Sequence, residues 1–254
     1  ATGPTSERRA AMVEAAGRTV SRPRGREAIL NLDPPDHTRL RSLVSKAFTP
    51  RAVERIRVRS GQLVDGVLDD LATREGPVDL IAELAFPLPF TVITELLGMP
   101  EGDRDQLRDW SHTITKTLDP LLAISHAAEI FDASDHMEQV VAEAIRWKRT
   151  RDDDDLLTAL IRAEDEGDVL SDTELIDNVT LLYLAGHETT VNLIGNGTKA
   201  LLDHPDQLER LAADPDLTPN AIEELLRYDS PVQFSRRILL EPFEIAGVPI
   251  PAGD

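Results

Sequence analysis

One run of ten residues, LLYLAGHETT from Leu181 to Thr190, constrains the fold of this chain most. Its neighbours are apolar on every side at helical spacing, which is typical of a buried helix. Yet the run contains a glycine, which costs about 1 kcal/mol in a helix interior. It also contains a carboxylate, which is costly to bury unless it is paired. Such exceptions to ordinary helix chemistry are expected where function requires them.

The helix that carries this run is expected to be unusually long. Ser171 and Glu174 have the spacing of a capping box, which marks a helix start. The apolar periodicity then continues to about Leu202, which corresponds to roughly 45 Å at 1.5 Å per residue. A helix of this length predicts a central element against which the other helices pack.

The polar residues of the run suggest a site in the helix wall. The hydroxyl of Thr189 can bond back to the carbonyl of Ala185, which tends to bend a helix. Gly186 removes side-chain bulk one turn earlier, so the two features together predict a groove for a small molecule. Glu188 beside the groove is a candidate proton relay. The alternative interpretation is a core threonine next to an incidental acid.

The remaining pattern predicts a mainly α fold with a small β part. We expect a helical region over residues 34–229, including one long helix from Ala123 to Arg149. From residue 232 to 251 we expect a strand, Phe234 to Leu240, and a β-hairpin, Phe243 to Ile250, with a tight turn at Ala246-Gly247. Residues 1–254 are expected to form one partial domain.

Composition excludes several classes of protein. The net charge of −19 argues against a general nucleic-acid-binding protein. No run approaches eighteen apolar residues and no basic-then-apolar leader opens the chain, so we expect neither a membrane span nor a secretory signal. A cytoplasmic protein is therefore expected. The chain contains no cysteine, which excludes a disulfide framework and a thiolate metal site built from these residues alone.

Positive charge is concentrated near the start of the chain, where residues 1–60 hold 13 Lys and Arg against 6 Asp and Glu. In one stretch only Glu54 opposes the cations, which are Arg39, Arg41, Lys46, Arg51, Arg55, Arg57 and Arg59. This run is interpreted either as a docking face for an acidic partner or as an ordinary solvated helix face.

Four segments of the sequence resemble segments of the bacterial cytochrome P450 family and occur in the same order as in that family. In chain order they are DPPDHTRLRSLVSKAFTP (Asp33 to Pro50), AGHETT within the long helix, EELLR (Glu223 to Arg227) and RILLEPFEIAGVPIPAG (Arg237 to Gly253). The resemblance covers about residues 30 to 254. It implies the cytochrome P450 helical fold, incomplete at both ends, and haem as the cofactor of the intact protein.

The resemblance also implies roles for the residues of the central helix. Thr189 and Glu188 would be the catalytic residues that deliver protons during dioxygen activation. Ala185 and Gly186 would form the groove beside the haem. These roles agree with the interpretation of the same run, from its residues alone, as a site in the wall of a helix.

Residues outside the central helix are assigned roles by the same resemblance. His37, Arg41 and Arg237 would bind the haem propionates, which are carboxylates that cationic or bidentate donors satisfy. Glu224 and Arg227, one turn apart on a helix, would form a buried structural pair completed by a third residue from a later segment. Taken alone, such a pair is usually a weak surface ion pair.

The implied activity is that of a haem-thiolate monooxygenase. Such an enzyme inserts one oxygen atom from dioxygen into a small hydrophobic substrate, with electrons passed from NAD(P)H through ferredoxin reductase and ferredoxin. The axial cysteine is absent from this chain, so no metal ligand is expected in it, and oxygen cleavage relies on that thiolate. We therefore expect a fragment, truncated before the cysteine loop, that is inactive alone.

A second hypothesis belongs to a different class of protein. Some relatives lack the cysteine, bind no haem and act as helper subunits that stabilise a partner enzyme such as a glycosyltransferase. The absence of cysteine favours this alternative. Retention of His37, Arg41, Glu188 and Thr189 disfavours it, because a haem-free helper has no need for them.

Overall fold

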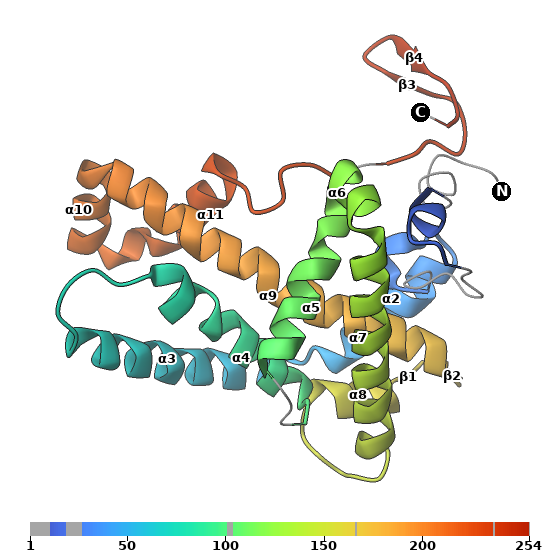
Figure 1. Cartoon of the computed structure of the whole chain (residues 1–254), viewed down its shortest axis with the longest axis horizontal. Helices are drawn as coiled ribbons and strands as arrows, with labels where there is room; N and C mark the ends of the chain where they lie inside the picture. The colour runs from blue at the N-terminus through green and yellow to red at the C-terminus, as the bar shows by residue number, and fades with distance from the viewer. Residues whose placement is uncertain (1–10, 19–26, 101–103, 166, 236, 254) are drawn as a thin grey trace.

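The computed structural model describes residues 11–18, 27–100, 104–165, 167–235 and 237–253. These residues form a mainly helical fold with two small antiparallel strand pairs, as predicted (Figure 1). The α-helices are α2 (Asp36–Ala47), α3 (Pro50–Ala72), α4 (Pro87–Leu97), α5 (Arg104–Thr115), α6 (Pro120–Ser125), α7 (Ala127–Lys148), α8 (Leu156–Arg162), α9 (Asp172–Asp203), α10 (Pro205–Ala213) and α11 (Thr218–Tyr228).

Short elements join these helices. The 3₁₀ turns are η1 (Ile29–Asn31), η3 (Lys116–Leu118) and η4 (Pro215–Leu217), and η2 (Ile81–Ala85) is a π-helical turn. Strand β1 (Glu164–Asp165) pairs with β2 (Asp168–Val169), and β3 (Phe243–Ile245) pairs with β4 (Val248–Ile250). None of the helices in the described ranges combines the length and the apolarity that a bilayer crossing requires.

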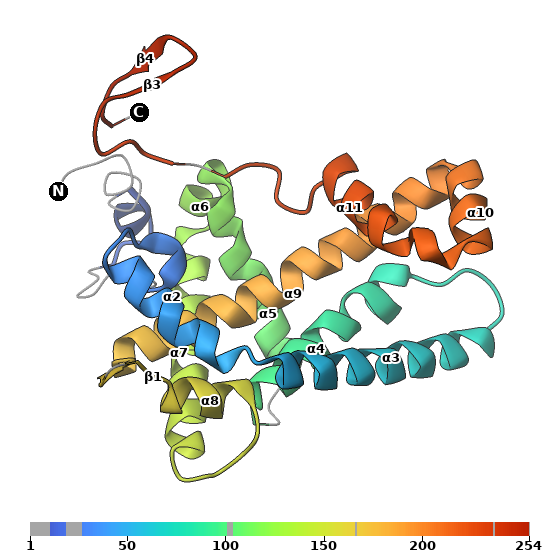
Figure 2. The same ribbon diagram turned by 180° about the vertical axis from the view of Figure 1, so that it is seen from behind.

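Helix α9 is the central element of the fold. Its start is the predicted capping box, in which the side chain of Ser171 accepts from the N–H of Glu174 at 3.2 Å and the Glu174 carboxylate accepts in return at 2.8 Å. The helix runs to Asp203 and contacts α4, α5 and α7. Figures 1 and 2 show α5 and α7 crossing α9 on one side.

One hydrophobic core joins α9 to its neighbours. On α9, Leu175, Val179 and Tyr183 are fully or almost fully buried. They pack in the same cluster as buried residues of α2, α4, α7 and α8, among them Leu40, Leu43, Val44, Ala47, Phe90, Leu97, Met137, Val141, Leu156, Leu157 and Leu160. The buried residues of α2 lie at helical spacing along one face of that helix.

Three glycines of α9 admit side chains from neighbouring elements. A Cβ atom at Gly186 would lie 2.8 Å from Ile93 of α4, and one at Gly195 would lie 2.8 Å from Ile81 of η2. At Gly197 it would lie 3.1 Å from Leu225 of α11. Real Cβ atoms rarely come so close to other carbons, so these glycines set how near each element approaches α9.

The segment before α2 is held to α9 by two buried polar side chains. Asn178 donates to the carbonyl of Glu27 at 3.0 Å and accepts from the N–H of Ile29 at 2.9 Å. Asp177 accepts from the N–H of Glu27 at 3.1 Å. These bonds satisfy backbone groups at the start of η1 and just before it.

The loop after α7 is held by ion pairs rather than left solvated. Its buried centre is Lys148, whose ammonium donates to Asp153 at 2.8 Å and also to Asp155. All four consecutive aspartates pair with a cation: Asp152 with Arg162, Asp153 with Lys148 and Arg151, Asp154 with Arg55, and Asp155 with Lys148.

Two of the predicted elements are wrong. The helix expected from Ala123 to Arg149 divides at His126, whose backbone (φ −113°, ψ 21°) leaves the helical region between α6 and α7. The strand expected from Phe234 to Leu240 is not formed by residues 234, 235 and 237–240. A strand needs a partner ladder, and the described residues provide none there.

The β-hairpin is confirmed. Phe243 lies opposite Ile250, and Ala246 and Gly247 both have positive φ (51° and 82°), as a two-residue hairpin turn requires. Figures 1 and 2 show the hairpin standing out from the helices, and all its strand residues except Ile250 are exposed.

Candidate active site on the central helix

The AGHETT run forms two successive side-chain bonds to the helix backbone. Thr189 Oγ1 donates to the carbonyl of Ala185 at 2.8 Å, which confirms the predicted bond, and Thr190 Oγ1 donates to the carbonyl of Gly186 at 3.3 Å. Ala185, Gly186 and Thr190 are exposed, whereas His187 is fully buried. The helix is therefore buried on one side here, and the prediction that it is buried all round is wrong for the described residues.

Gly186 has a packing reason that the sequence did not reveal. The space that a side chain would fill is taken by Ile93 of α4, at 2.8 Å from the position of a Cβ atom. The predicted notch is thus partly occupied by protein. Ala185 and Gly186 are nevertheless exposed.

The carboxylate of Glu188 lies between two imidazole rings. Its Oε1 atom is 3.7 Å from Nδ1 of His112 on α5, and its Oε2 atom is 3.7 Å from Nε2 of His187. The Glu188 side chain is 18 % exposed, and that of His112 is 70 % exposed. The acid that the sequence singled out therefore has an exposed partner and a buried partner, neither of which the sequence predicted.

His187 is enclosed by aromatic rings. Phe86 and Phe90 meet its ring edge-on, with centroids 5.3 and 5.7 Å away. Neither ring nitrogen has a hydrogen-bond partner among the described residues. Burial, and to a lesser extent the charge of His112, lowers the pKa of His187 to about 4. At neutral pH this imidazole is therefore uncharged.

Helix α2 presents two unpaired donors. His37 is half-buried and Arg41 is exposed, and they stand one turn apart on this helix. Among the described residues neither side chain has a hydrogen-bond or ion-pair partner. By contrast, Arg39 between them pairs with Asp168 at 3.1 Å and with Glu174. The two residues predicted to bind carboxylates are thus available for a ligand.

The other predicted residues lie nearer the end of the chain. Arg237 is exposed in the segment between α11 and β3 and donates to Ser235 at 2.8 Å. Glu224 and Arg227 form the expected pair with two bonds of 2.7 Å, and the Arg227 guanidinium lowers the pKa of Glu224. Both side chains are exposed, because no residue of α11 is buried. The expected burial of this pair depends on a third residue from a later segment, so the burial and the structural role both stay predictions.

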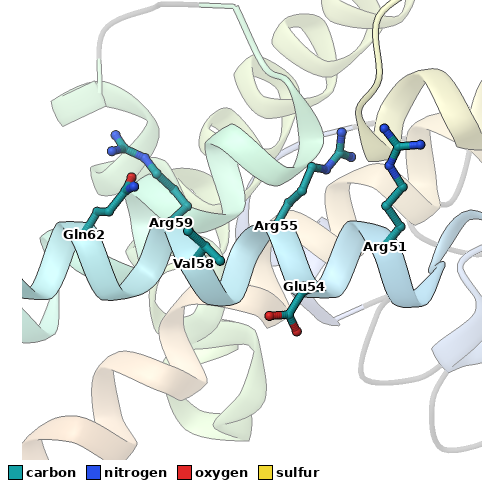
Figure 3. A pocket seen from close by; sticks show the side chains of 6 residues that line it. All are labelled: Arg51, Glu54, Arg55, Val58, Arg59 and Gln62. Carbon is teal, nitrogen blue, oxygen red and sulfur yellow. The ribbon is translucent and has the colours of Figure 1, made fainter.

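Most of the basic run pairs with acids of the same chain. Arg51 and Arg55 lie against Asp154, and Arg59 binds Glu95 with bonds of 2.7 and 2.8 Å. Figure 3 shows these three arginines projecting from one side of α3. They border a shallow groove of about 510 Å³ lined by Arg51, Glu54, Arg55, Val58, Arg59 and Gln62. This groove lies on α3 and does not include the AGHETT residues.

Comparisons with known proteins identify the family of this chain. The family model for cytochrome P450 matches residues 5–254. Cytochrome P450 107B1 of Saccharopolyspora erythraea is 51% identical over 227 residues, which cover 89% of this chain and 54% of that protein. Cytochrome P450 monooxygenase PikC of Streptomyces venezuelae is 48% identical over 89% of this chain and 53% of its own length. The chain spans about half the length of the curated relatives it matches.

Solved structures extend the agreement to the fold. The crystal structure of P450BioI in complex with hexadec-9Z-enoic acid ligated acyl carrier protein matches with a TM-score of 0.85 and 32% identity, over 100% of this chain and 63% of that one. The cytochrome P450 PksS of Bacillus subtilis 168 matches with a TM-score of 0.80 and 40% identity, over 90% and 58%. By sequence and by fold, this chain belongs to the cytochrome P450 family.

Proposed function

We propose that this chain is the N-terminal and central part of a haem-thiolate monooxygenase that inserts one oxygen atom from dioxygen into a hydrophobic organic substrate. The observation that carries the proposal is the AGHETT turn: Thr189 is bonded to Ala185 beside an open face of α9, with Glu188 next to it. Relatives of about twice this length that are named monooxygenases or hydroxylases support it. They give no support to a haem-free helper subunit.

The described residues fit a haem in two respects. His37 and Arg41 are donors without protein partners on α2, and they would hold the carboxylates of the cofactor through charge-assisted hydrogen bonds. The open backbone at Ala185 and Gly186 would lie beside the ring, and Arg237 would supply a further propionate donor. When bound, the haem would supply the iron that activates dioxygen. The residues of this sequence include no cysteine, so they would not themselves supply the thiolate of the proposed enzyme.

Thr189 and Glu188 would manage protons at this site. The Thr189 hydroxyl donates its own proton to the carbonyl of Ala185, so the free lone pairs of Oγ1 would accept a hydrogen bond from a water molecule. Glu188 is mostly buried yet reaches the exposed ring of His112, so it can exchange protons between solvent and the site. Proton delivery of this kind contributes about 10²- to 10⁴-fold to rates.

Electrons would come from NAD(P)H through ferredoxin reductase and ferredoxin. Ferredoxin would dock on the basic side of α3 (Figure 3). The Arg51 side chain there is 85 % exposed, and its guanidinium lies 4.0 Å from the carboxylate of Asp154, which is a long ion-pair distance. Arg55 and Arg59 are less available because Asp154 and Glu95 neutralise them. If this face docks ferredoxin, Arg51→Glu should raise the KM for ferredoxin, and salt should weaken the interaction. An unchanged KM at low salt would remove this face from the proposal.

The names of two relatives support a substrate class for this protein, and the proposed electron donor supports a cellular compartment. One relative, 47% identical, is named vitamin D(3) 25-hydroxylase, and another, 44% identical, is named 6-deoxyerythronolide B hydroxylase. We propose a small hydrophobic molecule for this protein as well, together with dioxygen. With ferredoxin as the electron donor, the enzyme would work in the cytoplasm.

The test uses the full-length protein. A reduced carbon-monoxide difference spectrum should show the band of a thiolate-ligated haem. Thr189→Ala should then divert reducing equivalents from product to hydrogen peroxide. Thr190→Ala is the matched control, because Thr190 makes the same kind of bond to its own helix and has no proposed role. A colourless protein after haem supplementation, or equal effects of both substitutions, would overturn the proposal.

A further inference from the structure

Glu188 has one neighbour that can exchange protons with solvent. His112 of α5 is exposed, and its Nδ1 atom lies 3.7 Å from Oε1 of the carboxylate. His187 lies at the same distance from the other oxygen, but its ring is sealed by Phe86 and Phe90. The two imidazoles are therefore chemically distinct although they face the same acid.

His187 cannot supply protons at neutral pH. Its burial holds its pKa near 4, and neither nitrogen reaches a donor or acceptor at hydrogen-bond distance among the described residues. It lines the inner side of Glu188 with a neutral ring, so it adds no positive charge there. His112 is left as the imidazole that can hold the carboxylate electrostatically.

We propose that His112 is a positioning residue that holds the Glu188 carboxylate toward α5 and transfers protons from solvent to it. The inference rests on the proposed function, since it assigns the source of the protons that Glu188 delivers. Both distances exceed that of a direct hydrogen bond. His112 is the more exposed of the two imidazoles, with 70 % of its side chain accessible.

The proton balance of the step is simple. Nδ1–H of the His112 imidazolium donates one proton to Oε1 of Glu188, which leaves a neutral imidazole and a neutral carboxylic acid. The imidazole takes a proton from solvent after Glu188 has passed its own proton inward. No electrons move and no other reactant is needed, so His112 and Glu188 both return to their starting state.

Other charged groups near this cluster are largely occupied with one another. From α4 and the residue before it, only the aromatic rings of Phe90 and Phe86 face His187, and on α7 the ring of His136 stacks on Trp110. Other charged pairs on the elements around α9 include Arg108 with Asp109 (3.3 Å), Lys116 with Glu129 (3.6 Å) and Arg59 with Glu95 (2.7 Å). Among the described residues, His112 is the exposed ionisable side chain that lies against the Glu188 carboxylate.

The first test does not depend on haem or activity. Imidazole ¹⁵N resonances are recorded on the full-length protein, with and without Glu188→Gln, and are assigned by substituting each histidine. The resonances of His112 should move when the carboxylate is removed. Those of His136, an exposed histidine on α7, should stay in place. Unchanged His112 resonances would overturn the inference, whatever the protein does with haem.

The second test is the pH profile of product formation by the loaded enzyme between pH 5.5 and 8.5. Turnover should fall with rising pH, because fewer protons reach Glu188 from solvent through His112. His112→Gln should flatten that limb and slow turnover by about tenfold, at or below the low end of acid–base effects. His112→Lys should restore the rate at pH 7 and move the falling part of the profile to higher pH, because the ordinary pKa of a lysine is about 10.4.

His136→Gln should keep the wild-type profile. A slower His112→Gln enzyme with an unchanged limb would mean a structural role only and would overturn the inference. If no variant, including wild type, makes product or binds haem, the proposed function fails instead, and the resonance test still decides whether His112 senses Glu188.

Discussion

Replacing Lys148 with methionine should destabilise the protein by about 3 kcal/mol. Lys148 is only 4 % exposed, and its ammonium binds Asp153 and Asp155 and lies 4.7 Å from the ring centroid of Trp147. Removing one member of a buried ion pair leaves its partner charged and uncompensated, which typically costs about 3–5 kcal/mol. The lower end applies here because Asp155 keeps the hydrogen bond from the N–H of Thr158 at 2.8 Å.

The assay is urea unfolding at pH 7 and 25 °C, followed by helical circular dichroism. Lys199→Met is the matched control, because Lys199 also pairs with an aspartate, Asp203, but on the exposed surface of α9. It should leave the midpoint unchanged. Asp155→Asn combined with Lys148→Met should recover part of the loss, because the uncompensated charge is then removed as well.

The reasoning would be refuted by a small effect. If Lys148→Met costs less than about 1 kcal/mol, the pair behaves as a surface ion pair, and the aspartate loop is solvated after all. If the double substitution costs as much as the two single ones added together, Lys148 and Asp155 are not coupled. Either result would remove the loop from the interactions that hold α7 against α8.

Three further predictions concern buried positions. His187→Phe should reduce the pH dependence of stability. The pKa of His187 is lowered from 6.5 to about 4 in the folded state, so the folded protein has its full stability above pH 6.5, and about 2 kcal/mol of the free energy of unfolding is lost between pH 7.5 and 5. Urea midpoints measured at both pH values would reveal this loss. Asn178→Leu should cost about 3 kcal/mol, since two backbone groups lose their partner; a loss below 1 kcal/mol by the same assay would contradict this. Gly98→Ala should lower the thermal midpoint, because φ is +61° and the new Cβ would lie 2.8 Å from the ammonium of Lys148; an unchanged midpoint would show that this corner relaxes freely.

Features set by a few neighbouring residues could be predicted from the sequence. The capping box at Ser171, the bond from Thr189 to Ala185 and the hairpin turn at Gly247 each depend on atoms within about four positions along the chain. For His37 and Arg41 the sequence predicts a role in binding propionates only through family resemblance, and that role stays a prediction.

Features set by the packing of distant elements could not be predicted. His112 meets Glu188 only because α5 crosses α9 at this level, and no spacing within the chain encodes that crossing. Ile93 fills the space at Gly186 for the same reason. The missing strand before the hairpin has a related cause, since β-propensity forms a strand only where a partner is available.

The three glycines of α9 have a practical consequence for engineering. The side chains of Ile93, Ile81 and Leu225 each pack directly against the backbone of this helix. These contacts therefore restrict the rotation of α9 about its own axis. Resizing any of these three side chains to reshape a binding cavity would let α9 shift against its neighbours. The direction in which the Thr189 hydroxyl points would then change, although no residue beside it had been altered.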